Sequence, residues 1–204
     1  MYEQEVKLTA PKCAVLGEVL RSDVVRRLDT GLGGEDGTRY LGIYYDTEAR
    51  ELEAAGCSLR ARLEGRRWRA ALKYRGTIDN GLSRRRELEA DIGGWPDCAG
   101  QLPDGGLKDS VLGVIPARAP LREYLRVDMR RSIRNLAFDG TGIELCADHA
   151  TIAASSRHTV LYEIELELKH GDVGKVVELG GMLMRRFPLT PSTLTKRRIG
   201  LNLG

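Results

Sequence analysis

The first residues of the chain carry a pattern of charges that could hold a metal ion and an anion together. In an extended strand, successive side chains point to opposite faces, so Glu3, Glu5 and Lys7 share one face. Two carboxylates at this spacing can bind one hard cation, and the neighbouring lysine can contact the anionic ligand of that cation. One such motif is also typical of the solvated edge of a sheet, so its meaning depends on whether other strands repeat it.

The same alternation recurs in four further segments. Residues 57–64, 67–74, 83–92 and 159–169 place apolar side chains on one face and mixed arginine, lysine and glutamate side chains on the other. The last segment is the clearest, because every second residue from Glu163 onward is charged. Strands are also predicted at 3–8, 39–45, 125–138 and 143–148, with a hairpin turn at 139–142 between the last two.

The strand pattern continues on both sides of a long segment that is rich in proline and glycine. Residues 93–120 hold four of the seven prolines, and we expect an excursion there with a short helix at 109–114. Because strands resume beyond it, residues 1–204 are predicted to form a single domain of the α+β class with an antiparallel sheet. Further helices are predicted at 11–29, 48–55 and 172–187.

Two architectures suit eight strands that each have one apolar and one charged face. In an open sheet, the apolar faces would pack on helices and the charged faces would lie in water. In a closed barrel, the charges would line the lumen and the helices would pack outside. The pattern favours the barrel, because arginine and glutamate dominate the charged faces and closure removes exposed strand edges. A lumen with both signs of charge implies water, metal ions and a polyanion as its contents.

The composition of the chain limits the classes of partner that the protein is expected to bind. The 32 basic and 29 acidic residues give a net charge of only +3, and aromatic residues are 5% of the chain, so nucleic acid is not expected as a partner. No apolar run of membrane-spanning length and no leader sequence are visible, so we expect a cytoplasmic protein without membrane contact. The four cysteines are widely spaced, which predicts free thiols and argues against zinc. Apolar helix faces could serve the core or a homodimer interface.

Seven short motifs follow one another along the chain. They are Glu3-x-Glu5-x-Lys7, Tyr44-Tyr45-Asp46-Thr47, Gly56-x-Ser58-Leu59-Arg60-x-Arg62, Ala71-Leu72-Lys73, Arg85-x-Glu87-x-Glu89, residues 162–167 and Thr195-Lys196. This ordered set, from residue 3 to about residue 200, resembles that of the CYTH family, the triphosphate tunnel metalloenzymes. The resemblance implies a closed eight-stranded antiparallel barrel with a charged lumen, a tunnel that binds a triphosphate and a divalent metal ion. Members of the family include inorganic and thiamine triphosphatases, class IV adenylyl cyclases and RNA triphosphatases.

The resemblance also implies roles for individual residues. The sixth strand is ambiguous, because the family's arginine matches Arg131, whereas alternation from Val127 and Met129 points Arg126 and Arg130 inward. Glu167 is treated as secondary to the two glutamates before it. The implied metal ligands are Glu3, Glu5, Glu87, Glu89, Asp148, Glu163 and Glu165. The implied phosphate-binding residues are Lys7, Arg60, Arg62, Lys73, Arg85, Arg131 and Lys196. The implied catalytic set is Glu3, Glu5, Lys7, Arg60, Arg62, Lys73 and Glu165.

The expected reaction is metal-dependent hydrolysis of a small triphosphate, with inorganic triphosphate cleaved to pyrophosphate and phosphate as the leading candidate. All-oxygen carboxylate ligands suit Mg²⁺ or Mn²⁺ as the cofactor, and either one or two ions could bind. No serine, cysteine or histidine nucleophile is evident. Two alternatives remain open at this point: cyclisation of ATP to cyclic AMP by a class IV adenylyl cyclase, and non-catalytic binding of polyphosphate or nucleotide.

Overall fold

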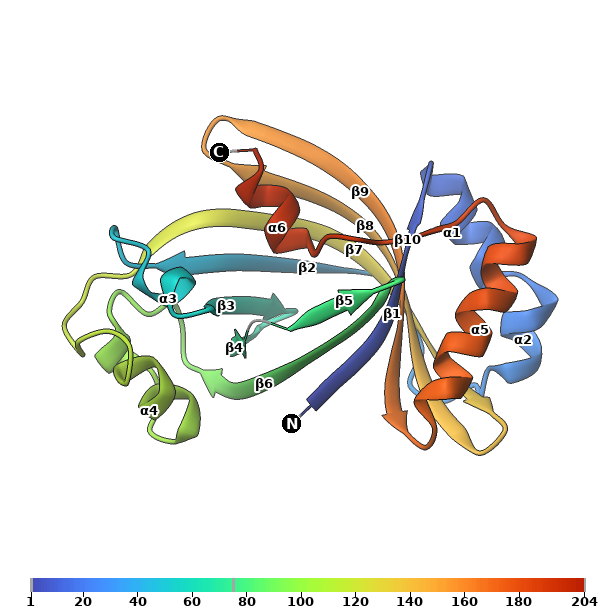
Figure 1. The fold of residues 1–204 in the computed structure, drawn as a ribbon, viewed down its shortest axis with the longest axis horizontal. Coiled ribbons are helices and arrows are strands. Elements are labelled where there is room, and N and C mark those ends of the chain that lie inside the picture. The colour runs from blue at the N-terminus through green and yellow to red at the C-terminus, as the bar shows by residue number, and fades with distance from the viewer. Residues whose placement is uncertain (1, 75, 204) are drawn as a thin grey trace.

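Eight antiparallel strands form a closed ring in the computed structural model, which describes residues 2–74 and 76–203 (Figure 1). The first strand pairs with the sixth, from Tyr2 opposite Arg86 to Val6 opposite Leu82, and this pairing closes the sheet. The predicted closed barrel is therefore confirmed. In order around the ring, the strands are β1 (Tyr2–Ala10), β9 (Arg157–His170), β8 (Thr141–Ala154), β7 (Arg122–Phe138), β2 (Glu35–Asp46), β3 (Cys57–Glu64), β4 (Arg67–Tyr74) and β6 (Leu82–Ile92).

Two short strands lie outside the ring and were not predicted. β5 (Thr77–Asp79) pairs with β6, and β10 (Thr190–Pro191) pairs with β1. The predicted hairpin between β7 and β8 is present. Its turn residues Asp139 and Gly140 both have positive φ, 46° and 77°, as the tight two-residue turn of a twisted hairpin requires.

Three helices cover the apolar outer face of β1, β8 and β9 on one side of the barrel (Figure 1). The helix predicted at 11–29 is divided at Ser22, whose hydroxyl accepts a hydrogen bond from the Val25 amide and begins a second helix. The helix predicted at 172–187 is present and buries Val176, Leu179 and Leu183. These helices are α1 (Cys13–Leu20), α2 (Asp23–Leu28) and α5 (Val173–Arg186).

The excursion after β6 packs on the outer face of β3 and β4. It contains a 3₁₀ turn, Ala99–Gln101, and α4 (Gly106–Leu112), and it buries Leu102 and Val111 in one cluster with Leu59 and Leu72. The short helix predicted at 48–55 is α3 (Glu51–Ala54). None of the helices in the described residues is long and apolar enough to cross a membrane.

One helix near the C-terminus, α6 (Lys196–Leu201), was not predicted from the sequence. It begins where the Thr195 hydroxyl accepts a hydrogen bond from the Arg198 amide. The helix packs at one end of the barrel against Leu125, which shares an apolar cluster with Val127 of the lumen wall. Its contact with the barrel is close because Gly200 has no side chain: a Cβ atom there would overlap the Leu125 side chain.

Replacing Gly200 with alanine should therefore loosen α6. We expect Gly200→Ala to lower the free energy of unfolding by about 1–3 kcal/mol, the usual cost of overpacking a filled site. Urea denaturation measures this change. Gly93→Ala is the matched control, because a Cβ atom at Gly93 meets nothing within 4 Å, and it should change stability by less than about 0.5 kcal/mol. Equal stability of the two variants would contradict the tight docking of α6.

Candidate active site

The lumen contains a cavity of about 560 Å³ to which all eight ring strands and α6 contribute side chains. Nine basic and eight acidic residues line it. Twelve of the fourteen residues predicted as metal-binding or phosphate-binding are among them, and the other two, Asp148 and Glu163, lie fully buried behind the wall. The structure therefore brings together every residue that the sequence singled out, although their placement does not by itself assign their roles.

Strand register explains why residues distant in sequence become neighbours. On β1 and β9, Lys7 lies opposite Glu165. On β8, Asp148 lies opposite both Glu163 of β9 and Arg131 of β7. Directly opposite side chains on one face of antiparallel strands are within contact distance. The period-two alternation turns these residues inward, and the register then places opposite charges side by side.

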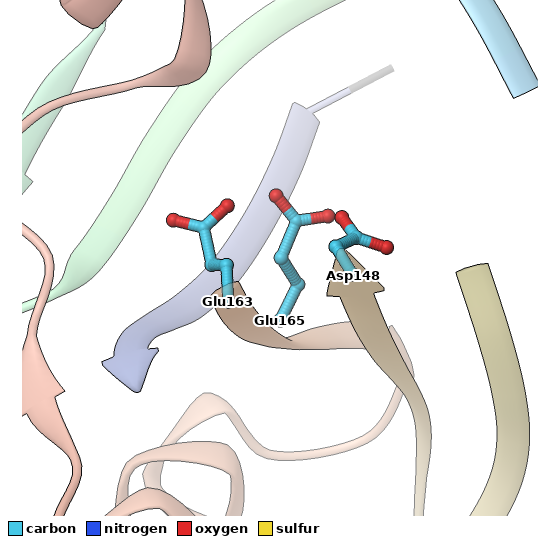
Figure 2. A group of neighbouring side chains, drawn as sticks. All are labelled: Asp148, Glu163 and Glu165. Carbon is cyan, nitrogen blue, oxygen red and sulfur yellow. The ribbon is translucent and has the colours of Figure 1, made fainter. Parts of the chain in front are cut away.

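Three buried carboxylates form one close group in the site. Asp148, Glu163 and Glu165 each offer an oxygen atom, and these atoms lie within 4.8 Å of one another. Figure 2 shows the three carboxyl groups side by side, with Glu163 and Glu165 on one strand and Asp148 on the next. This group of three is called the acidic triad below. Its oxygen ligands and its spacing fit a hard divalent cation such as Mg²⁺ or Mn²⁺ better than a soft metal.

Three cations hold the acidic triad together. Arg131 donates two hydrogen bonds to Asp148, at 2.7 and 2.6 Å, and a third to Glu165. Lys196 forms ion pairs with all three carboxylates, at 2.9 Å to Asp148 and 2.9 Å to Glu165. Lys7 bonds to Glu165 and also lies 3.0 Å from Glu5. The acidic triad is thus linked to β1, where the first motif lies.

The pKa values within the acidic triad differ. Burial acts to raise the pKa of Glu165, but Lys196, Lys7 and Arg131 outweigh it and hold that pKa well below its usual range. At Asp148, burial again acts to raise the pKa, but Arg131 and Lys196 outweigh it, so the pKa of Asp148 is also lowered. At Glu163 burial prevails over Lys196 and Lys7, and Glu165 adds to it, so its pKa is raised. The three carboxyl groups of the triad thus differ in how readily they bind a proton, and Glu163 binds one most readily.

A second acidic group lies further along the lumen on β1 and β6. Lys73 donates to Glu87 at 2.8 Å and to Glu3 at 3.2 Å, and Arg85 donates to Glu3 and, at 3.0 Å, to Glu5. Burial and the neighbouring cations Arg85 and Arg60 lower the pKa of Lys73. The local field is therefore positive despite the carboxylates.

Two arginines on β3 have fewer carboxylate partners than the other cations. Within the described residues Arg60 makes no ion pair, and its buried Nε donates no hydrogen bond. Gly42 lies on the opposing strand, and a Cβ atom there would be in ordinary van der Waals contact with Arg60, 3.6 Å from its Cδ. Arg62 pairs with Glu64, yet burial and the nearby charges of Arg60 and Arg131 lower its pKa. This part of the lumen is suited to an anion.

The structure corrects one expectation on β7. Alternation was expected to turn Arg126 and Arg130 inward, but both are exposed, while Val127, Met129 and Arg131 share the lumen face. The expectation assumed that every apolar face points outward. It is wrong here because the end of the barrel near α6 has an apolar interior, and no bulge interrupts the pairing of β7 with β8.

Several lining residues were not predicted as site residues. Arg69 and Lys169 follow the same alternation as the predicted ones, so the pattern could have identified them. Tyr44 lies in a motif that was noted but given no role. Thr195 could not have been found from a strand pattern, because it precedes the unpredicted helix α6.

One family model and several solved structures match this chain. A sequence model described as the CYTH domain matches residues 1–186. A structure from Hippeastrum, HpAC1, described as an adenylyl cyclase candidate with a dominant triphosphatase activity, has a TM-score of 0.73 at 19% identity, covering 98% of this chain and 95% of that one. A Pyrococcus horikoshii protein has a TM-score of 0.57 at 18% identity (97% and 98% covered), and the Mimivirus capping enzyme triphosphatase 0.54 at 11% (90% and 89%). At these identities the structures show a shared fold.

The different pKa values of Glu165 and Glu163 predict opposite effects of removing their charges. Because the folded-state pKa of Glu165 is lowered, its stabilisation is present above the unfolded-state pKa of about 4.3 and is lost as pH falls through the folded-state pKa. Glu165→Gln should therefore lower the free energy of unfolding at pH 7 by about 3 kcal/mol, as expected for a broken buried pair. This loss should shrink when the pH falls below about 4.

Glu163→Gln is the matched comparison. The folded-state pKa of Glu163 is raised, so the ionised form of this carboxyl group opposes folding once the pH exceeds its unfolded-state pKa. An amide removes that penalty, and the variant should be as stable as the wild type or more stable at pH 7. Urea denaturation between about pH 3 and 7, without divalent metal, measures both variants. An equal loss of stability in the two would show that the acidic triad does not distinguish these carboxylates.

Proposed function

The chain belongs to the CYTH domain family, and on that premise we propose that it is a divalent-metal-dependent triphosphatase that cleaves inorganic triphosphate to pyrophosphate and phosphate. The observation that carries this proposal is the juxtaposition, in one lumen, of two under-paired arginines with two groups of carboxylates. The arginines suit a concentrated anion, and the carboxylates suit the cations that accompany it.

In this proposal the basic residues bind the phosphate chain. Arg60 and Arg62 each offer a planar donor group that can contact two oxygens at once, while Lys7, Lys73 and Lys196 act as point charges. Charge-assisted hydrogen bonds from these groups stabilise the negative charge that develops on the leaving pyrophosphate. Arg85 and Arg131 complete the phosphate-binding set from opposite sides of the ring.

The carboxylates have two tasks. Without a ligand, they neutralise the buried cations, as the ion pairs of Lys7, Lys73 and Lys196 show. When a triphosphate takes over those cations, the carboxylates are released, and the acidic triad with Glu3, Glu5, Glu87 and Glu89 would hold Mg²⁺ or Mn²⁺. A bound ion supplies electrostatic stabilisation of the phosphate chain and acidifies a water molecule. The released carboxylates orient the attacking water for in-line displacement at the terminal phosphorus.

Cyclisation of ATP is the second candidate, and one feature of the lumen favours it. Tyr40, Val127 and Met129 form an apolar part of the wall, against which a nucleobase could lie. The Tyr40 ring already has other contacts, however, which argues against cyclisation. The guanidinium groups of Arg62 and Arg131 lie 5.8 and 5.9 Å from the centre of the ring, and the Tyr40 hydroxyl donates to Glu35. Trp68 and Trp95 contact each other outside the lumen. Hydrolysis needs only a water molecule beside the phosphate, so we place it first.

Product analysis distinguishes the two reactions. With Mg²⁺ or Mn²⁺, we expect inorganic triphosphate to be cleaved to pyrophosphate and phosphate with a higher kcat/KM than ATP, and we expect little or no cyclic AMP from ATP. The reason is that the lumen presents many phosphate-binding groups and few that could read a base. Phosphate release and chromatography of the nucleotides measure both. Cyclic AMP and pyrophosphate as the main products would promote the cyclase reading, and loss of turnover on chelation tests metal dependence.

Arg60 offers a test in which binding separates from stability. Because Arg60 makes no ion pair within the described residues, Arg60→Gln breaks none. It removes attraction to Glu3 and Glu87 as well as repulsion from Arg62. The free energy of unfolding should therefore change little, whereas KM for triphosphate should rise by about 10- to 100-fold, the value of a lost charge-assisted hydrogen bond of 1.5–3 kcal/mol. Steady-state kinetics and thermal denaturation measure the two effects.

The control is Arg126→Gln on the outer face of β7, where Arg126 pairs with Glu123. This variant should leave KM unchanged. A normal KM for Arg60→Gln would remove Arg60 from the phosphate-binding set.

A further inference from the structure

A second cavity of about 480 Å³ adjoins the tunnel and is lined in part by residues of α3, β5 and α6. We call it the rear chamber. Its wall shares four side chains with the main cavity, namely those of Tyr44, Lys73, Arg85 and Thr195. These four residues therefore lie between the two spaces, and we call them the neck. Three of the four can donate a hydrogen bond from a cation or an aliphatic hydroxyl group.

The rear chamber is more strongly basic than the tunnel. Among the described residues, four basic ones line it, namely Lys73 and Arg85 of the neck with Arg197 and Arg198, against one carboxylate, that of Glu53. In the tunnel, by contrast, the two signs of charge nearly balance. Hydroxyl groups of Ser58, Thr77, Ser83 and Thr193 complete the lining. Cationic groups mixed with hydroxyl donors are the partners that phosphate oxygens use in proteins.

The two arginines of α6 differ in how they are held. Arg197 donates to the Tyr124 hydroxyl at 2.8 Å and lies 3.4 Å from Glu53, so its position is fixed. The side chain of Arg198 is exposed, and among the described residues it forms no ion pair. An anion in the rear chamber would find one preorganised guanidinium group and one that is free to turn toward it.

Tyr44 at the neck gives independent support for a positive field there. Burial acts to raise the pKa of its hydroxyl, yet Arg60, Lys73, Arg85 and Lys196 together lower it. These four cations therefore outweigh the desolvation of a phenol that is 6% exposed, and the field at the Tyr44 hydroxyl is positive.

We propose that the rear chamber is a second anion site, which binds an inorganic phosphate ion between Arg197, Arg198 and the neck, and that a product of triphosphate cleavage leaves by this route. The binding site stands on the chamber alone, whereas the exit route rests on the proposed function. A phosphate ion that leaves through the neck would not have to pass the substrate entering at the other end of the lumen.

Calorimetric titration of inorganic phosphate tests the site directly. The tunnel is first saturated, in the presence of Mg²⁺, with the imido analogue of inorganic triphosphate, whose nitrogen bridges resist hydrolysis. We expect the saturated wild-type protein to bind one further orthophosphate or pyrophosphate ion per chain. Arg198→Gln should weaken that binding at least fivefold and change the affinity for the analogue by less than twofold.

Arg186→Gln is the matched control, because Arg186 is an exposed arginine at the end of α5, away from both cavities, and its loss should leave phosphate binding unchanged. The inference is overturned if the saturated protein binds no phosphate, or if Arg198→Gln binds it as well as the wild type does. Because the readout is binding, it remains valid even if triphosphate is not turned over. A failure of the proposed function would appear separately, in the product analysis.

Discussion

The pairing of β1 with β6 closes the barrel, and the charged contacts of the lumen depend on that closure. Glu3 and Glu5 lie on β1, while their partner Arg85 lies on β6, so the ion pairs form only across this seam. In an open sheet the same side chains would face water, where ion pairs contribute 0–1 kcal/mol. Inside the ring they are desolvated, and each must have a partner because an unpaired buried ion costs several kcal/mol.

The lumen is therefore a network of interchangeable partners. Lys196 contacts three carboxylates and Arg131 contacts two, so neither of these cations depends on one acid alone. Such a network can release some contacts to a ligand while keeping others, which limits the free energy lost when an anion enters. The same arrangement fixes the donor groups before binding, and preorganised donors stabilise developing charge without further rearrangement.

The end of the barrel near α6 follows a different rule. There the interior is apolar, with Leu125, Val127 and Ile152 packed around Ile199. The helix thus closes part of the lumen by hydrophobic contact and also positions Lys196 at its first residue, within reach of the acidic triad. The six-residue helix α6 therefore links the apolar packing at one end of the barrel to the ion pairs in the middle of the lumen.

Much of the fold followed from the sequence, because the alternation of side chains along a strand is a local property. The faces of β3, β4 and β9 could be assigned without knowing their neighbours, and with them Arg60, Lys73 and Glu165 as inward-facing residues. The family resemblance then supplied the order of the motifs and the expected tunnel. Only the resemblance, and no spacing, gave Asp148 a place beside the glutamates of β9.

The sequence alone could not determine the features that depend on contacts between distant segments. The acidic triad exists because register sets Asp148 opposite Glu163, and no local pattern fixes register. Whether Arg130 or Arg131 faces inward depended on what fills the barrel near α6, because apolar residues point inward only where another apolar group meets them. α6 itself is six residues long, too short to be stable alone, and it forms where Leu125 and the capping Thr195 hold it. Local alternation thus determined which side chains could share a face, and tertiary packing determined which of them meet.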